Sequence, residues 1–508
     1  MPKTDQEAVL AFLQGGALGP GVARIDTHAA IVLLAGERAF KLKRPVRYSF
    51  LDFTTLARRE AALRHELELN RRHAPELYRR VLPVTRDATG LALAGTGSPV
   101  EWLLEMQRFP AEAQLDRVAA AGGLVDTLVD ALAETVARSH AGATPRPDKG
   151  GAAAMREIAL GNRTDLEAVV PAVFHVATVR DLDTATMATL DRISLLLDRR
   201  RAAGCVRHCH GDLHLANIVL LDGRPVLFDC IEFDDDFACI DVLYDLAFLV
   251  MDLIEKGHRP AATRLLNGWL ERTADHAGLV LLPLFLSLRA AIRAKVLGLA
   301  ARGDASAERA EPVRYLDLAA RFLDPAPPML LAVGGASGTG KTTLARALAA
   351  DLPGPAPGAV ILRSDVIRKE LFGRAATDRL PQDAYVTEVS TRVFATIAER
   401  AATCLAAGHS VIADAVYGHA DQRAALAAVA AAHGAPFRGL WLEAPLPLKL
   451  DRVARRTGDA SDADAAVVRR QAETIDGATV GWRRLAADRP IAELAAEALA
   501  LARRPEEC

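Results

Sequence analysis

One short stretch of the sequence has the residue spacing of a phosphate-binding loop. Residues 335–342 read GASGTGKT, which fits the pattern G-x-x-x-x-G-K-[ST]. An apolar run precedes the stretch and the helix-favouring segment 343–349 follows it, so the loop would join a strand to a helix. Glycines let backbone N–H groups wrap around phosphate oxygens, and the helix start adds a favourable dipole. We expect this loop to bind a nucleoside triphosphate through Gly335, Ser337, Gly338, Thr339, Gly340, Lys341, Thr342 and Thr343.

Two aspartates follow the next apolar runs of the same region. Asp365 and Asp414 each come at the carboxyl end of an expected strand, where an acceptor hydroxyl or a metal ion would lie. Asp365 is a candidate general base, with a helix N-cap as the alternative. Lys341 is expected to reach the β- and γ-phosphates, and Thr342 and Asp414 to hold Mg²⁺. For Asp414 the alternative is a turn aspartate.

An arginine-bearing helix is expected after the strand that ends at residue 443. The stretch LDRVARR offers Arg452, Arg455 and Arg456, which are candidates to neutralise charge on a transferring phosphoryl group. We assign Arg452 and Arg456 to nucleotide binding. A solvated helix face is the alternative.

A second constellation lies in the first half of the chain. Residues 210–217 read HGDLHLAN, and Asp212 precedes Asn217 by the interval of a kinase catalytic loop, H-x-D-x-x-x-x-N. Asp229 ends the apolar run VLFD. Asp212 is expected to accept the proton of an attacking hydroxyl, and Asn217 and Asp229 to bind Mg²⁺. The alternative is a polar loop with N-capping aspartates.

The motifs HGDLHLAN and VLFDCIEF, with DVLYDLA downstream, resemble the aminoglycoside phosphotransferase-like family. The resemblance implies a structural role for Asp245 in holding the catalytic loop. It also implies that Lys41 contacts the α- and β-phosphates, with Lys43 as second choice. Glu66 is the expected partner of that lysine, with Glu60 as second choice. The family's glycine-rich loop is missing before Lys41, where the turn DTHA stands instead.

The region from about residue 329 to 475 resembles P-loop small-molecule kinases such as gluconate kinase. The resemblance is carried by GASGTGKT, RSDVIRKEL, VIADAVY and RVARRTGDASDAD. Taken whole, the chain resembles bacterial proteins described as bifunctional aminoglycoside phosphotransferase/ATP-binding proteins. The segment DPAPP at 324–328 marks the expected boundary, because proline-rich segments do not continue a helix. We expect an α+β kinase-like bilobal domain over 1–326, with a small lobe over about 1–110 and a helical lobe over about 111–326. An α/β P-loop domain with a parallel sheet is expected over 327–508.

Composition limits the remaining classes. Lys and Arg number 62 against 64 Asp and Glu, so the near-neutral chain gives no global argument for nucleic acid. The apolar runs considered, 243–250 and 328–333, are too short to span a bilayer, and a cytoplasmic protein is expected. Histidines and cysteines cluster over 205–214 without a second cysteine pair at ligand spacing, so we expect no zinc site there.

The sequence therefore predicts an ATP- and Mg²⁺-dependent phosphotransferase with two kinase modules, each acting on a hydroxyl of a small molecule. Two alternatives stay open: one module is a nucleotide-binding regulator, or the P-loop module is a polynucleotide 5′-hydroxyl kinase. Neither acceptor and no oligomeric state follows from the sequence.

Overall fold

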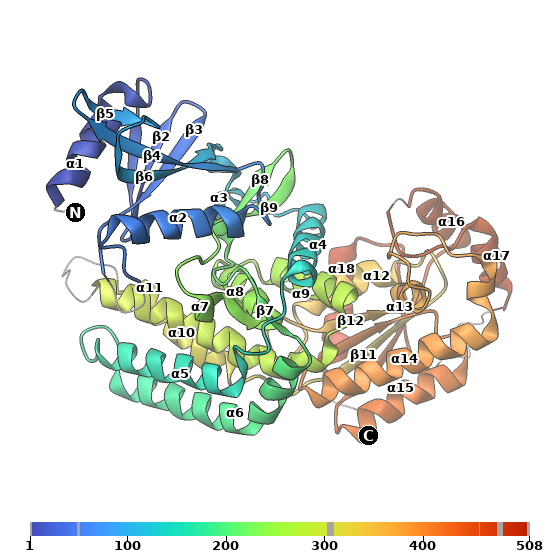
Figure 1. Cartoon of the computed structure of the whole chain (residues 1–508). Coiled ribbons are helices and arrows are strands. Elements are labelled where there is room, and N and C mark those ends of the chain that lie inside the picture. Colours follow the sequence, from blue (N-terminus) through green and yellow to red (C-terminus); the bar gives the residue numbers. More distant parts are fainter. Residues whose placement is uncertain (1–2, 48–50, 302–308, 457, 475–480, 505–508) are drawn as a thin grey trace. The chain divides into compact units, whose positions relative to one another are not determined.

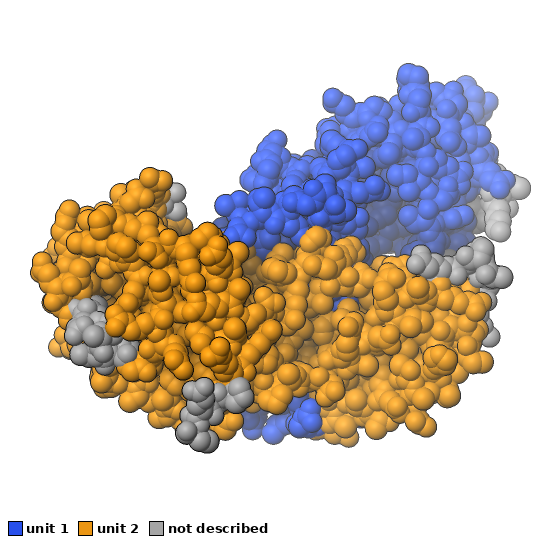
Figure 2. All heavy atoms as spheres, turned by 180° about the vertical axis from the view of Figure 1, so that it is seen from behind, with its two compact units in different colours: residues 1–157, 192–252 blue, residues 158–191, 253–508 orange. Residues whose placement is uncertain are grey.

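The computed structural model describes the chain except for residues 1–2, 48–50, 302–308, 457, 475–480 and 505–508 (Figure 1). Its packing divides into two compact units (Figure 2). Unit 1 holds residues 1–157 and 192–252, and unit 2 holds residues 158–191 and 253–508. This division by packing differs from a division of the chain at residue 326, which stays a prediction.

Unit 1 begins with a six-stranded antiparallel sheet in the order β1-β2-β3-β6-β4-β5. Strands β2 and β3 form an antiparallel hairpin that places Lys41 opposite Val32. Helix α2 follows, with Leu63 packed in a buried cluster that includes Leu104 of the sheet. The elements are α1 Lys3–Phe12, β1 Ala23–Asp26, β2 Ala30–Ala35, β3 Arg38–Lys43, α2 Leu56–Asn70, β4 Tyr78–Asp87, β5 Gly90–Leu93 and β6 Ser98–Gln107.

The rest of the kinase-like region is mainly helical, as expected. Short strands interrupt the helices where the catalytic-loop motif lies. The elements are α3 Leu115–Ala120, α4 Asp126–Gly142, α5 Gly151–Glu167, α6 Val176–Ala202, β7 Val206–His208, β8 Ile218–Leu221, β9 Arg224–Leu227, α7 Asp235–Ala238, β10 Cys239–Asp241, α8 Val242–Glu255, α9 Arg259–Thr273, η4 His276–Leu281, α10 Leu282–Ala301 and α11 Ala310–Phe322.

The C-terminal part contains a five-stranded, wholly parallel sheet in the order β12-β13-β11-β14-β15. Strand and helix alternate along the chain, so each crossover returns the next strand in the same direction. The expected fold, a kinase-like domain followed by a parallel α/β domain, is confirmed. The elements are β11 Leu330–Gly334, α12 Lys341–Ala349, β12 Val360–Arg363, α13 Ser364–Leu371, α14 Thr387–Ala406, β13 Val411–Asp414, α15 Ala420–Ala432, β14 Phe437–Glu443, α16 Leu446–Ala454, α17 Ala465–Thr474, β15 Arg483–Ala486 and α18 Ile491–Arg503.

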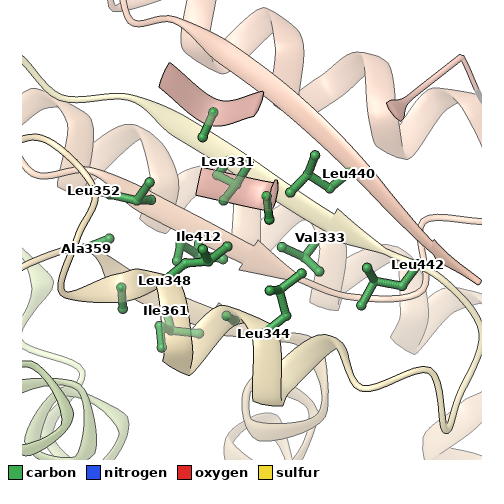
Figure 3. Packing of buried hydrophobic residues seen from close by; sticks show 14 of the residues in the cluster. Leu331, Val333, Leu344, Leu348, Leu352, Ala359, Ile361, Ile412, Leu440 and Leu442 are labelled. Carbon is green, nitrogen blue, oxygen red and sulfur yellow. The ribbon is translucent and has the colours of Figure 1, made fainter. Parts of the chain in front are cut away.

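The apolar core of this sheet fixes the loop that follows β11. Leu331 and Val333 of β11 pack with Leu344 and Leu348 of α12 in one buried cluster (Figure 3). All four side chains are at most 1% exposed. Because strand and helix are both anchored by burial, the loop that joins them at 335–340 has fixed ends.

One helix among the described residues exceeds the apolar length that the sequence analysis considered. The segment His276–Ala301 is long and apolar enough to cross a membrane, and 72% of its most apolar window is buried inside the protein. A core helix of a soluble protein passes the same test. The runs 243–250 and 328–333 do not include this helix.

A buried histidine joins this region to the P-loop sheet. His409 is 0% exposed, and its Nε2 lies 3.1 Å from the carbonyl oxygen of Leu279 in η4. The carbonyl accepts, so Nε2 carries the proton. Nδ1 has no hydrogen-bond partner among the described residues. Burial accordingly lowers the pKa of His409 to about 4.

This contact predicts an acid-sensitive unit 2. His409 stays neutral in the folded protein down to about pH 4, whereas an unfolded histidine takes up a proton below about pH 6.5. Stability should therefore be full above pH 6.5 and fall by about 2 kcal/mol between pH 7 and pH 5. His409→Gln keeps a donor and should remove this part of the pH dependence.

Urea unfolding at pH 7 and pH 5, followed by tryptophan fluorescence, measures the effect, since Trp269, Trp441 and Trp482 all belong to unit 2. The matched control is His433→Gln, because His433 is exposed. Equal pH dependence in His409→Gln and the wild type would contradict the assignment.

Candidate active sites

A tight hairpin in unit 1 positions two of the predicted site residues. Strands β8 and β9 are joined by Asp222 and Gly223, which both have positive φ, as a two-residue hairpin turn requires. Asn217 precedes β8 and Asp229 follows β9. The N–H of Phe228 donates to the carbonyl of Asn217 at 3.0 Å, so the open end of the hairpin brings the two segments together.

The catalytic-loop motif is held from below by a buried carboxylate. Asp245 accepts from the N–H groups of His210 and Gly211, at 3.3 and 2.9 Å, and lies 3.1 Å from Nε2 of His140. This is the structural role that the family resemblance implied. At the top of the loop, Nδ2 of Asn217 donates to the carboxylate of Asp212 at 2.9 Å. The structure therefore brings Asp212 and Asn217 into direct contact.

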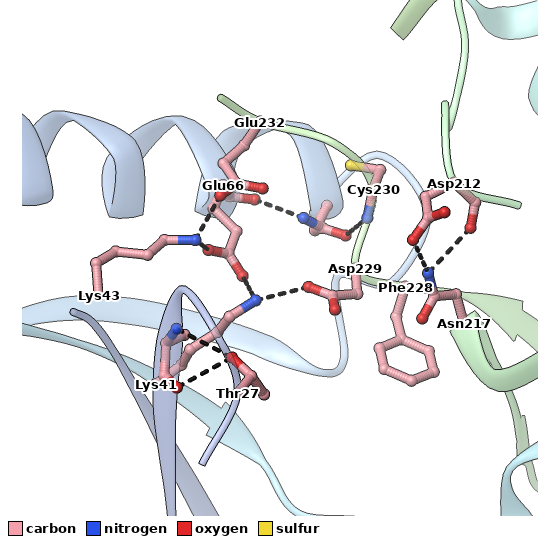
Figure 4. Close-up of polar contacts among 12 residues, drawn as sticks. Thr27, Lys41, Lys43, Glu66, Asp212, Asn217, Phe228, Asp229, Cys230 and Glu232 are labelled. Atoms are coloured by element: carbon pink, nitrogen blue, oxygen red, sulfur yellow. Dashed lines mark hydrogen bonds and ion pairs between the residues drawn. The ribbon is translucent and has the colours of Figure 1, made fainter. Parts of the chain in front are cut away.

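The buried Lys43, the partly buried Lys41 and three carboxylates form a network of ion pairs in this site (Figure 4). Nζ of Lys41 lies 2.7 Å from Oε1 of Glu66 and 2.7 Å from Oδ1 of Asp229. Nζ of Lys43 lies 2.7 Å from Oε2 of the same Glu66 and also pairs with Glu232. Glu66 is thus shared by both lysines. The structure brings Lys41, Glu66 and Asp229 together as the sequence predicted, and adds Lys43 to the same network.

The alternative helix acid lies elsewhere. Glu60 pairs with Arg64 on the outer face of α2, an ordinary i,i+4 surface pair. Burial would lower the pKa of Lys41, but Asp229, Glu66 and Glu232 together raise it well above its usual value. Lys41 is therefore held as a cation.

Asp229 is fixed in a conformation that few residues adopt. Its φ is +60°, which is costly for a residue with a Cβ and is typical of functional positions. The hydroxyl of Tyr78 accepts from its N–H at 3.0 Å, and Oδ1 of Asn70 accepts from the next N–H, that of Cys230, at 3.0 Å. Burial would raise the pKa of Asp229, but the ion pair with Lys41 lowers it below its usual value. The carboxylate is therefore ionised, and the backbone that carries it is fixed in position.

A cavity of about 460 Å³ lies over these groups. Apolar side chains line much of it, which suits a flat base, while Lys41, Asp212 and Asp229 line it at one side. Thr27 and His28, from the turn that replaces the family's glycine-rich loop, also line it. The side chain of Thr27 is turned to its own backbone, accepting from the N–H of Ala30 at 3.0 Å.

The second site is the loop after β11 in unit 2. Gly338 and Gly340 have φ of +83° and +94°, and a Cβ at Gly338 would lie 2.7 Å from the carbonyl of Lys449. Only glycine fits such a backbone. The N–H of Ser337 already donates to Oε1 of Gln471 at 2.7 Å, so a side-chain oxygen from α17 occupies a position where a phosphate oxygen would bind.

Parallel strands bring the expected metal-binding pair of this loop together. Asp414 lies beside Val333 of β11 and Arg363 of β12 in register. Its Oδ2 accepts from the hydroxyl of Thr342 at 2.6 Å. Burial raises the pKa of Asp414 above its usual value, and burial lowers that of Lys341, although each group partly offsets the shift of the other. Nζ of Lys341 itself donates to the carbonyl of Ala336 at 3.1 Å, so its ammonium group is turned back to the loop.

A cavity of about 590 Å³ lies beside this loop and is lined by most of the residues predicted for the second site. Its lining includes residues 337–343, Asp365, Asp414 and the arginines of α16 and the segment after it. Asp365 lies in the first turn of α13, and Arg363 rather than Asp365 is the N-cap. The structure thus places Asp365 in the cavity and not at the capping position.

The arginines differ in what they contact. Arg452 donates to the carbonyls of Thr339 and Ala487, at 3.3 and 2.8 Å, and so ties α16 to the loop. Arg456 lies 3.5 Å from Asp459, and its Nη1 is buried without a partner among the described residues. Arg455 is exposed and pairs with Asp451 on its own helix. All three arginines line the cavity, and Arg452 is the one that donates to the loop.

Five residues in or beside these sites were not predicted: Glu232, Tyr78, Arg363, Asp459 and Gln471. Glu232 lies three positions after Asp229 and Arg363 two before Asp365, so closeness to a motif was a usable signal for both. Tyr78 and Gln471 reach their sites from distant segments, and their surroundings in the sequence carry no comparable signal.

Two groups of histidine, cysteine and aspartate lie close enough to share a metal ion: His140 with Cys209 and Asp245, and His208 with Asp235 and Cys239. In each group, at least one residue already accepts hydrogen bonds from other parts of the protein. Asp245 holds the catalytic loop, and Arg146 donates to both Asp235 and the sulfur of Cys239. A guanidinium in the second group opposes binding of a cation.

Family models match both the kinase-like region and the P-loop region of the chain. The family model described as "Phosphotransferase enzyme family" matches residues 31–280, and that described as "AAA domain" matches residues 330–477. Uncharacterized proteins of Mycobacterium tuberculosis and Mycobacterium bovis are 32% identical over 463 residues, covering 89% of this chain and 90% of each relative. The chain belongs to their family. It joins a phosphotransferase domain to a P-loop kinase domain, and it is a phosphotransferase.

Two solved structures are also similar in part. A choline/ethanolamine kinase family protein from Mesorhizobium loti is 13% identical, with a TM-score of 0.38, over 63% of this chain and 94% of that chain. A gluconokinase from Sinorhizobium meliloti is 24% identical, with a TM-score of 0.25, over 35% of this chain and 93% of that chain.

The shared carboxylate of the first site gives a prediction. Glu66→Gln removes the negative charge between Lys41 and Lys43 and leaves one anchor fewer for each. We expect about tenfold weaker binding of a non-hydrolysable ATP analogue at this site, or more. Amide hydrogen exchange of residues 38–43, followed during titration with the analogue, reports this site separately from the P-loop.

The matched control is Glu60→Gln on the same helix, which should titrate like the wild type. Exchange of β2 and β3 without nucleotide shows whether the Glu66→Gln sheet is intact. Equal loss of affinity in both variants would contradict the central role of Glu66.

Proposed function

We propose that the protein transfers the γ-phosphoryl group of ATP to hydroxyl groups of small molecules at two separate sites. The observation that carries the proposal is the same set of three groups in both cavities. Each holds a partly buried lysine suited to phosphate, a carboxylate suited to a metal ion, and a further aspartate suited to a hydroxyl proton.

In the first site, Lys41 binds the α- and β-phosphates and Glu66 keeps its ammonium group in place. Mg²⁺ would be held by Asn217 and Asp229, and the fixed, ionised Asp229 fits this task. Asp212 orients the acceptor hydroxyl and takes its proton as the new bond to phosphorus forms. The amide of Asn217 keeps the carboxylate of Asp212 turned toward the acceptor.

In the second site, the amides of residues 337–343 and Lys341 bind the β- and γ-phosphates. Mg²⁺ would be held by Thr342 and Asp414, whose direct contact and burial fit an oxygen-binding cation. Asp365 takes the acceptor proton, and Arg452 and Arg456 neutralise charge on the transferred group. An Mg²⁺ ion held by these residues would offset the negative charge of the phosphate groups. Cavities of about 590 and 460 Å³ have the size of small-molecule sites, so we propose small acceptors and a cytoplasmic setting.

The two aspartates should separate the two reactions. Asp212→Asn should lower transfer at the first site, and Asp365→Asn at the second, by about 10²- to 10⁴-fold, while binding of the ATP analogue at each site stays near wild type. The full chain is incubated with γ-labelled ATP and a panel of hydroxyl-bearing metabolites, and labelled products are separated by mass.

Each variant should remove its own set of products and leave the other set. Products unchanged in both variants would defeat the proposal. Nucleotide binding at one site with no dependence of any product on its aspartate would favour a regulatory role for that module. Salt-sensitive labelling of oligonucleotide 5′ ends, lost in Asp365→Asn, would favour the polynucleotide kinase alternative.

A further inference from the structure

Helix α9 lies inside the residues matched by the phosphotransferase family model, yet it packs within unit 2 together with the P-loop sheet. Strand β12 is the first strand in the order of that sheet, so one of its edges has no neighbouring strand. An open edge leaves backbone N–H and carbonyl groups without partners. Helix α9 supplies partners for this edge.

The contact imitates the hydrogen bonds of a neighbouring strand. Oδ1 of Asn267 accepts from the N–H of Ile361 at 2.7 Å, and its Nδ2 donates to the carbonyl of Ala359 at 3.1 Å. The hydroxyl of Thr263, one turn earlier, donates to the carbonyl of Pro357 at 3.0 Å. Asn267 is only 7% exposed. A buried amide that uses both its donor and its acceptor on one strand fixes the position of that strand.

The next turn of the same helix face reaches the P-loop cavity. Glu271 lies four residues after Asn267, and its Oε1 is 3.8 Å from Nη1 of Arg363 at the end of β12. Arg363 is 6% exposed and lines the cavity. Its Nη2 donates to Asp459 at 2.6 Å, and its Nε lies 4.0 Å from Asp414. Three carboxylates therefore surround one guanidinium.

This arrangement leaves Asp414 hydrogen-bonded to Thr342 and not to Arg363. Asp414 already accepts from Thr342, and Arg363 stops short of a hydrogen bond with it, at 4.0 Å. Buried charge must be balanced nearby. Without the carboxylate of Glu271, the guanidinium would depend more on Asp414, and a positively charged group beside Asp414 opposes binding of a second cation there.

We propose that α9 is a structural part of the P-loop module and that Glu271 is a positioning residue of its active site. Glu271 balances Arg363, so that Asp414 and Thr342 stay available to Mg²⁺. The role of Glu271 rests on the proposed function of Asp414 and Thr342, whereas the closure of the β12 edge by Asn267 does not.

Two measurements on the full chain test the two parts. Asn267→Ala should raise hydrogen exchange at the amide of Ile361 about tenfold, because its acceptor is lost, and Asn267→Asp, which keeps an acceptor, should raise it less. For Glu271, exchange of residues 335–343 is followed with a fixed concentration of ATP analogue while Mg²⁺ is varied. Glu271→Gln should raise the half-maximal Mg²⁺ concentration about three- to tenfold, and Glu271→Asp should restore it.

The control for charge removal is Glu399→Gln, since Glu399 is exposed on α14 of the same unit. It should leave the Mg²⁺ midpoint unchanged. A wild-type midpoint in Glu271→Gln would overturn the role of Glu271. Wild-type exchange at Ile361 in Asn267→Ala would overturn the role of α9. If the ATP analogue fails to protect residues 335–343 even in the wild type, the proposed function of the loop is wrong. The exchange of the Ile361 amide still decides the role of α9 in that case.

Discussion

Buried positive charge is the constraint on which both sites depend. A lysine that is to bind phosphate must stay charged and in place before the nucleotide arrives, although burial opposes its charge. The first site meets this requirement with carboxylates on both sides of Lys41, Glu66 from α2 and Asp229 from the segment after β9. In the second site the nearby carboxylates do not outweigh the effect of burial, and the pKa of Lys341 is lowered. Its loop amides are fixed by glycine conformations and by Gln471 instead.

The chain brings these carboxylates to the two sites in two different ways. Asn217 and Asp229 are twelve residues apart, and only a two-residue turn at Asp222 and Gly223 closes the hairpin that unites them. In the P-loop sheet, parallel pairing places Asp414 between β11 and β12 without any turn. One site is thus assembled by local chain reversal and the other by the common direction of its strands.

These two modes of assembly set what the sequence could predict. Asp212 and Asn217 precede one short hairpin and Asp229 follows it, all at fixed intervals, and Gly335 to Thr342 is one continuous loop, so spacing alone indicated both. Family resemblance also indicated that a glutamate of the following helix would pair with Lys41. The structure places Glu66, the first choice, next to Lys41. The role of Asp365 as a base and of Asp414 as a metal ligand stay predictions, although both residues line the cavity.

What spacing could not predict are contacts between residues far apart in the chain. Gln471 reaches Ser337 across 134 positions, and Asn267 reaches Ile361 across 94. The proline-rich break at 324–328 indicated a boundary because local backbone chemistry is visible in sequence. The edge of β12 is visible only once the strand order is known, and the amide that closes it comes from before that break. The proline-rich break therefore does not coincide with the limit of the packing unit, and the residues that cover the edge of the P-loop sheet come from α9, well before that break.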